Sequence, residues 1–254
     1  MSYEAMTPTR NRMGRRIMKT RNIHLGIIAL LSVWMPFTAK AQDKVKASVG
    51  VDLVSGYVWR GQDLGGVSLQ PAASVAYKGF SLEARGATGV SKTDADGDDA
   101  KEFDLTLGYS AGGFNVSITD YWYNTGTGYF HYGAHNTAHL YEARLGYDFG
   151  PVAVNWYTNF AGADGVKENG KRAYSSYISV AAPFKLGGLD WTAEVGATPW
   201  ETDFYKAGGF AVCDVSLEAS KEIRITRSFS LPLFAKVTWN PCSERAYFVA
   251  GLGF

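Results

Sequence analysis

Long apolar runs are absent from most of this 254-residue sequence. The longest, Leu25 to Phe37, has 13 residues, whereas a helix that crosses a bilayer needs about 20. After Phe37 no apolar segment approaches that length, which excludes a helical inner-membrane protein. Stretches that favour helices are also few, while Tyr, Phe, Trp and Gly are abundant. This composition favours β-structure.

An excess of basic residues is also missing from the part of the chain that we expect to remain after export. Residues 1–41 have the features of a secretory signal: a basic segment from Arg10 to Arg21, the apolar run, and a small-x-small cleavage site at Ala39-Lys40-Ala41. They hold seven basic residues and one acidic residue, so residues 42–254 carry 18 basic and 23 acidic residues, a net charge of −5. This balance argues against a nucleic-acid-binding protein.

Cysteine is scarce, because the chain has only Cys213 and Cys242. No cysteine follows the cleavage site, so a lipid-anchored amino terminus is not expected. Two cysteines in an exported chain allow one disulfide. If their strands are neighbours, both sulfurs lie near the outer rim and can pair, and the alternative is two free thiols. Neither cysteine has a catalytic context.

The last ten residues show the pattern that organises the remaining sequence. Phe248, Ala250, Leu252 and Phe254 share one side of a period-2 strand, and smaller or amphipathic residues share the other. A final strand that alternates this way and ends on an aromatic is typical of Gram-negative outer-membrane barrels. We expect the barrel-assembly machinery to recognise this strand through Phe254. The alternative is the terminal strand of a soluble sandwich.

The same alternation divides residues 42–254 into twelve segments joined in turn by short turns and longer polar loops. This predicts an all-β fold, a closed antiparallel transmembrane β-barrel of about 12 strands with short periplasmic turns and longer extracellular loops. The first strand is expected from Lys46 to Arg60 and the eighth, the weakest pattern, from Tyr174 to Phe184, with ten or fourteen strands left open. Outward aromatics near strand ends are expected to form interfacial girdles; they include Tyr57, Trp59, Tyr109, Trp122 and Trp239.

Charged residues on the opposite parity are expected to line the lumen, with acids in excess. The Glu-Ala-Arg triplet occurs twice, at Glu83–Arg85 and Glu142–Arg144. A transverse field in a narrow aqueous pore would select small hydrophilic solutes, whereas mutual neutralisation would plug the barrel. The predicted pore-lining residues are Asp52, Arg60, Glu83, Arg85, Asp104, Glu142, Arg144, Glu194 and Lys236, and the same inward parity includes Gln70, Asp190, Asp214 and Glu218.

Three histidines, His131, His135 and His139, lie close together in a predicted outer loop. Spacing of four suits metal ligands on a helix, but the segment has no helical pattern, so solvated loop histidines are the expectation, with no metal or other cofactor. The acidic run Asp94–Asp99 lacks the closing glutamate of a calcium loop. A lipid hydrolase would need a nucleophile and an oriented histidine. His139 has no nearby serine on its face, so no enzyme activity is expected.

Short motifs resemble those of a bacterial outer-membrane family. Ser55-Gly56-Tyr57-Val58-Trp59-Arg60-Gly61 followed by Gln70-Pro71-Ala72 is similar to the opening signature of the TorF-type porins, also described as Gcw_chp proteins of unknown function. Segments 200–205 and 230–233 and the end at Gly251-Leu252-Gly253-Phe254 are similar too. The resemblance implies an outer-membrane barrel and a channel role and supplies no catalytic residues. The histidine-bearing loop and the two cysteines depart from it.

These observations predict a porin of the Gram-negative outer membrane that contacts outer-membrane lipids and passes small hydrophilic solutes. The alternatives are a closed barrel that binds a ligand through its extracellular loops, and an outer-membrane lipid hydrolase.

Overall fold

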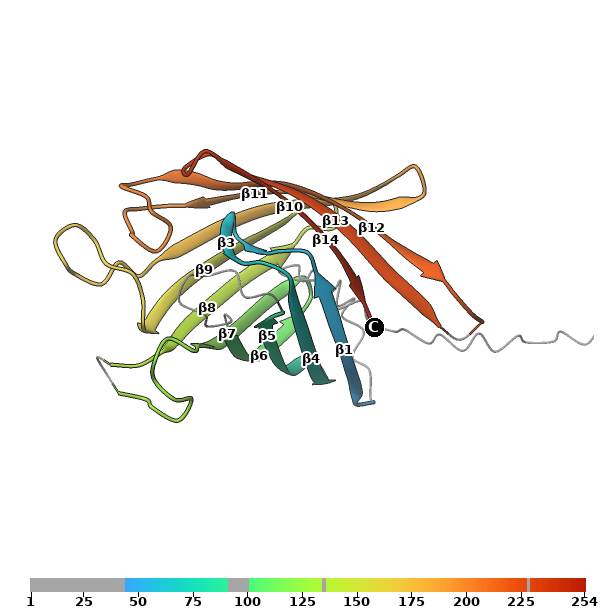
Figure 1. Cartoon of the computed structure of the whole chain (residues 1–254), viewed down its shortest axis with the longest axis horizontal. Coiled ribbons are helices and arrows are strands. Elements are labelled where there is room, and N and C mark those ends of the chain that lie inside the picture. The colour runs from blue at the N-terminus through green and yellow to red at the C-terminus, as the bar shows by residue number, and fades with distance from the viewer. Residues whose placement is uncertain (1–43, 91–100, 134–135, 228) are drawn as a thin grey trace, which may run out of the picture.

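Twelve strands form a closed antiparallel barrel in the computed structural model, which describes residues 44–90, 101–133, 136–227 and 229–254 (Figure 1). Two further short strands, β2 (Tyr57–Trp59) and β3 (Gln62–Gly65), pair only with each other. The barrel strands are β1 (Lys46–Val54), β4 (Ser68–Tyr77), β5 (Phe80–Gly89), β6 (Lys101–Ala111), β7 (Phe114–Tyr123), β8 (His139–Asp148), β9 (Ala153–Gly162), β10 (Ser176–Leu186), β11 (Leu189–Thr198), β12 (Ala211–Arg224), β13 (Ser230–Asn240) and β14 (Arg245–Gly253).

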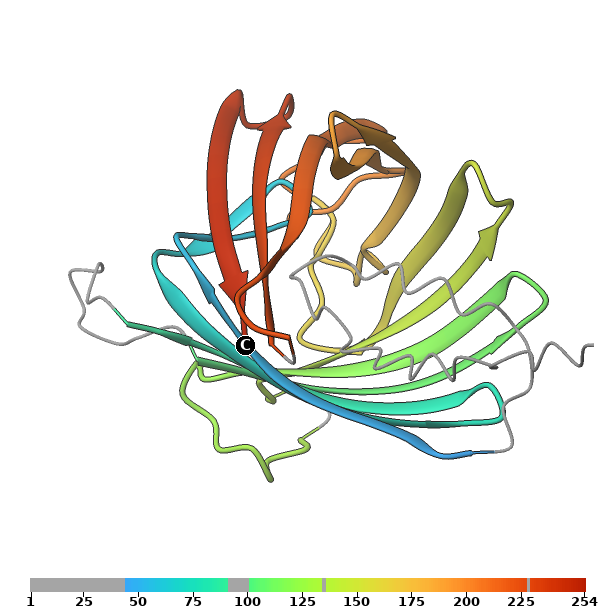
Figure 2. The ribbon, with the colours of Figure 1, turned by 90° about the vertical axis from the view of Figure 1, so that its right-hand side faces the viewer.

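Closure comes from β1, which pairs antiparallel with β4 on one side and with β14 on the other. Figure 1 shows β1 and β14 side by side near the C-terminal end, and Figure 2 shows the ring of strands around the lumen. The short connections, such as Lys78-Gly79 and Gly187-Gly188, lie at one end, called here the turn rim. The longer ones, including 124–138, 163–175 and 199–210, lie at the other end, the loop rim.

The two faces of the barrel wall differ in polarity as a transmembrane barrel requires. Outward side chains are large, apolar and exposed: Val49 is 83% exposed, Leu107 58% and Phe248 66%. Inward positions of the same strands hold Asp52, Asp104 and other polar residues. A water-soluble barrel would place its apolar residues inside, so this outer face is built to contact hydrocarbon. Within the described ranges, no helix is long and apolar enough to cross a membrane.

The predicted fold class and the count of twelve barrel strands are confirmed. The weak eighth pattern is a barrel strand, β10, which pairs with β9 and β11. The predicted first strand is wrong in its second half, because β1 ends at Val54 and the chain then turns away from the wall. The predicted signal segment 1–41, the run Asp94–Asp99 and His135 lie outside the described residues.

Candidate functional site

The β2–β3 hairpin folds into the lumen at the loop rim. Its strands pair Trp59 with Gln62, which leaves Arg60 and Gly61 as a two-residue turn. Both turn residues have positive φ, 48° and 74°, the conformation of a type I′ hairpin. A positive φ is strained for arginine. The strain therefore has to be compensated by the contacts that Arg60 makes.

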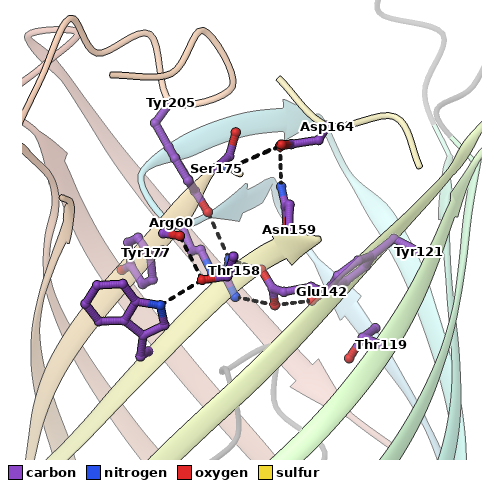
Figure 3. A network of polar contacts seen from close by, with 12 residues as sticks. Arg60, Thr119, Tyr121, Glu142, Thr158, Asn159, Asp164, Ser175, Tyr177 and Tyr205 are labelled. Atoms are coloured by element: carbon purple, nitrogen blue, oxygen red, sulfur yellow. Dashed lines mark hydrogen bonds and ion pairs between the residues drawn. The ribbon is translucent and has the colours of Figure 1, made fainter. Parts of the chain in front are cut away.

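Arg60 joins the hairpin tip to the barrel wall (Figure 3). Its Nη1 donates to Oε2 of Glu142 on β8 at 2.5 Å, and its Nη2 donates to Oε1 at 2.9 Å. The side chains of this pair are 4% and 3% exposed, so the two-pronged ion pair is screened little by water. The Tyr121 hydroxyl donates to Glu142 Oε1 at 3.1 Å, which further satisfies the carboxylate.

Aromatic rings enclose the same guanidinium. The Arg60 Cζ lies 4.0 Å from the ring centroid of Tyr157, 4.2 Å from that of Trp59 and 4.8 Å from that of Tyr177. These are cation–π distances. The charge is thus held by one carboxylate and by the π faces of residues from β2, β9 and β10.

The backbone of the tip contacts β12 and β13 directly. The Asn240 Nδ2 donates to the Gly61 carbonyl at 2.9 Å. A Cβ at position 61 would lie 1.8 Å from the carbonyl oxygen of Cys213. Only glycine fits this place, because both the space and the positive φ exclude a side chain. The hairpin therefore reaches from β1 to β12 and β13 and obstructs the lumen at the loop rim.

Two loops of the loop rim complete the surroundings of the Arg60 side chain. The Tyr205 hydroxyl, from loop 199–210, accepts from Arg60 Nη1 at 2.9 Å. That loop is joined to loop 163–175, where the Val166 amide donates to Asp203 at 2.6 Å and Trp200 Nε1 donates to the Ala173 carbonyl at 3.0 Å. Burial raises the pKa of the Tyr205 phenol, and the nearby Arg60 charge lowers it by less, so Tyr205 stays neutral.

Below the hairpin a second arginine, Arg85 on β5, contacts polar side chains of the neighbouring strands β4 and β6. The Arg85 Nη2 donates to Gln70 Oε1 at 2.6 Å, and its Nη1 lies 3.6 Å from Asp104 Oδ2. The Tyr57 hydroxyl of the hairpin donates to Glu102 Oε2 at 2.6 Å, next to this group. The base of the hairpin is therefore tied to β6 as its tip is tied to β8.

The structure places the predicted inward residues as follows. Arg60 and Glu142 meet in one ion pair and Arg85 and Asp104 in another, while Arg144 donates to Asn155. Four predicted pore residues remain on the inward face: Asp52, Glu83, Glu194 and Lys236. Glu194 accepts a hydrogen bond from Tyr177. The other three make no hydrogen bond or ion pair with the described residues. Arg60 comes from the hairpin and not from a wall strand, which sequence alternation alone missed.

Tyr57 and Trp59 do not belong to an outer aromatic girdle. Tyr57 is buried in the lumen, and Trp59 packs edge-on against Tyr121 and Phe204. The prediction is wrong because the period-2 pattern continues through Ser55 while the chain itself turns inward. Tyr109 and Trp239 do face outward, at 40% and 51% exposure.

The cysteines are both free, so the expected rim disulfide is not formed in this structure. The register shifts where β12 passes Gly196 and Ala197. Cys213, at this irregularity, is buried with Tyr157, Tyr177 and Tyr205. Cys242 is exposed beyond β13, where its Sγ contacts the Lys206 carbonyl at 3.6 Å. The prediction assumed two regular neighbouring strands with both sulfurs at the rim.

His139 is buried and not a solvated loop residue. Its Nδ1 lies 2.7 Å from Asp120 Oδ1, and its Nε2 lies 2.5 Å from the Tyr129 carbonyl oxygen. Tyr132 stacks on the imidazole with ring centroids 4.3 Å apart. Sequence reasoning missed Asp120 as the carboxylate partner, because only the β7–β8 register brings it near. His139 Nε2 is hydrogen-bonded to the Tyr129 carbonyl. In a hydrolase with Asp120 as the orienting carboxylate, this nitrogen would instead face the nucleophile.

Loop 124–138 covers this histidine from outside the barrel. Figure 2 shows the loop outside the ring of strands. Within it Tyr129 packs against Phe103 and Trp122, both on the outer parity, and Phe130 is 88% exposed. In the part of the chain that the structure describes, no group of His, Cys, Asp and Glu is arranged to hold a metal ion.

No protein-family model matches this sequence, and no curated protein matches it. Among solved structures, the chain is similar to an outer-membrane channel from Pseudomonas putida F1, with 12% sequence identity and a TM-score of 0.39 over 86% of this chain and 97% of that chain. The barrel fold of this chain is established by its own strand pairing, and the TorF-type resemblance stays a prediction.

Proposed function

We propose that this protein is an outer-membrane channel for small hydrophilic solutes, narrowed at the loop rim by the β2–β3 hairpin. The observation that carries the proposal is a charged lumen below a docked hairpin. Glu83 and Lys236 face this lumen, are partly exposed, and make no hydrogen bond or ion pair with the described residues. An ionised group costs many kcal/mol in a dry interior, on the order of 20 before relaxation. Water in the lumen avoids this cost.

The loop rim is proposed to face the cell exterior and the turn rim the periplasm, because outer-membrane barrels have short periplasmic turns and longer extracellular loops. A solute from outside would then meet the joined loops 163–175 and 199–210 and the Arg60 tip first. The apolar outer face would contact outer-membrane lipids. The barrel-assembly machinery would recognise the carboxy-terminal strand that ends at Phe254.

The hairpin gives the channel a constriction that is separate from its wall. The tip is held by the Arg60–Glu142 ion pair and by the bond from Asn240 to Gly61, whereas the barrel is held by the strand ladders. Withdrawing the tip would therefore widen the lumen and leave the barrel folded. The competing function, a closed barrel that binds a ligand with its loops, requires instead that the hairpin is a permanent plug.

Single-channel conductance in a planar bilayer tests the proposal with protein purified from outer membranes. We expect discrete steps from the native protein and larger steps from Arg60→Ala, whose tip has lost its ion pair. Arg227→Ala is the matched control, because it removes an exposed arginine in the turn between β12 and β13, at the rim away from the hairpin. Folding of each variant is checked by heat-modifiable migration in gels. A folded native barrel and a folded Arg60→Ala barrel that both fail to conduct would favour the closed barrel.

A further inference from the structure

One wall of the lumen gathers three carboxylates in a small area. Glu194 lies on β11 and Asp214 and Glu218 lie on β12, all on the inward face. Glu194 is opposite Ser216, which lies between the other two on β12. All three are buried, at 6%, 2% and 3% exposure. The only cation opposite them in the register is Lys236, the partner of Glu218.

Tyr177 and Ser216 are the side-chain hydrogen-bond donors to Asp214. The Tyr177 hydroxyl lies 3.3 Å from Asp214 Oδ2 and 3.3 Å from Glu194 Oε1, so one hydroxyl hydrogen is shared between two carboxylates. Asp214 Oδ1 is fully buried and has no hydrogen-bond partner among the described residues. A buried carboxylate oxygen without a donor costs about 1–3 kcal/mol or more. The group is therefore short of donors and of positive charge.

The opposite wall has the same imbalance. Asp104 Oδ1 is also buried with no hydrogen-bond partner in the part of the chain that the structure describes, although Arg85 Nη1 lies 3.6 Å from Asp104 Oδ2. Among the described residues of the barrel wall and the hairpin tip, and away from the turn rim, inward carboxylates outnumber inward bases two to one. The acids are Asp52, Glu83, Glu102, Asp104, Glu142, Glu194, Asp214 and Glu218, and the bases are Arg60, Arg85, Arg144 and Lys236. A narrow passage lined by one sign of charge concentrates counter-ions.

We propose that the channel selects small cations, and that Glu194, Asp214 and Glu218 form its cation-binding wall. Protonated amines fit this wall, because an ammonium group supplies several N–H donors and one positive charge, which are what Asp214 and its neighbours lack. Tyr177 fixes the carboxylates from behind. This inference rests on the proposed channel function, since it names the class of solute that passes.

The test is the reversal potential of single channels in a KCl gradient, followed by block with ethylammonium. The native protein is expected to prefer potassium over chloride. Glu194→Gln/Asp214→Asn/Glu218→Gln, which keeps side-chain size, should lower this permeability ratio by roughly threefold or more, since clefts of one charge sign enrich counter-ions by about tenfold or more. Ethylammonium should slow potassium current in the native channel and not in the triple variant.

Glu244→Gln is the matched control, since Glu244 is exposed in the turn before β14 and outside the lumen. It should leave the ratio unchanged. Asp214→Asn alone serves if the triple variant fails to fold. Steps that prefer chloride, or a potassium preference that survives the substitutions, would overturn the cation wall and leave the channel intact. A folded barrel without steps, also in Arg60→Ala, would overturn both proposals.

Discussion

Replacing Arg60 with alanine should release the hairpin from the lumen wall. Glu142, which is 3% exposed in the native protein, would keep only the Tyr121 hydroxyl as a partner among the described residues while the hairpin stays docked. Breaking one side of a buried ion pair costs about 3–5 kcal/mol. Undocking lets water reach Glu142, so this cost falls on the docked state alone. At about 1.4 kcal/mol per tenfold, the undocked population should rise roughly a hundredfold to several thousandfold until undocking is complete.

Cys213 provides a native probe for this release. It is 1% exposed, and its carbonyl oxygen lies against the hairpin tip at Gly61. The exposed thiol is removed by Cys242→Ser, and maleimide labelling of Cys213 is then followed in time. When docking and undocking are faster than labelling, the labelling rate follows the undocked population. The rate should therefore rise in Arg60→Ala by the factor given above.

Two comparisons isolate the ion pair as the cause. Lys236→Ala removes another lumen charge and should label at the background rate. Arg60→Ala combined with Glu142→Ala leaves no unpaired carboxylate at this place, so the labelling rate of Cys213 should return most of the way toward the background rate. The double-mutant cycle formed by these variants gives the coupling energy of the ion pair. If Arg60→Ala labels no faster than the Cys242→Ser background, the ion pair does not hold the hairpin in place.

Three other substitutions test separate parts of the structure. Gly61→Ala should prevent docking because its Cβ would lie 1.8 Å from the Cys213 carbonyl oxygen; larger conductance steps are expected, and steps of native size would contradict the tip contact. His139→Ala removes the bonds to Asp120 and the Tyr129 carbonyl, each worth about 0.5–1.5 kcal/mol. Chymotrypsin should then cut loop 124–138 about fivefold faster or more, and an unchanged rate would show that stacking alone holds the loop. Leu107→Arg puts a charge on the lipid face and should destabilise the barrel by about 2–4 kcal/mol, as measured by urea unfolding in liposomes against Leu107→Ile; an equal midpoint would place Leu107 outside the hydrocarbon.

The barrel could be predicted because its pattern is local. Outward and inward residues alternate along each strand, and turns such as Lys78-Gly79 stand between them. The weak pattern at β10 can also be assigned to a strand. The adjacent strands β9 and β11 each need a hydrogen-bonded partner strand within the hydrocarbon layer. The inward charges from Asp52 to Lys236 followed from the same parity.

The hairpin could not be predicted because nothing local marks its departure from the wall. Tyr57 and Trp59 have the aromatic character of an outer girdle, and Arg60 has the parity of a lumen residue. The departure becomes evident only through partners far away in the sequence, above all Glu142 and Asn240. Asp120 escaped notice for the same reason, because the β7–β8 register brings it to His139. Cys213 was misplaced because a change in register has no sequence signature here.

The span of the hairpin's contacts has a consequence for assembly. Arg60 and Glu142 are 82 positions apart, and Gly61 and Asn240 are 179 apart. The hairpin follows β1 and precedes all the other barrel strands in the sequence, yet its docking site exists only when β8, β12 and β13 are in place. Contacts this distant close late in folding. The lumen is therefore expected to stay open until the wall is nearly complete, with the constriction forming as one of the last events.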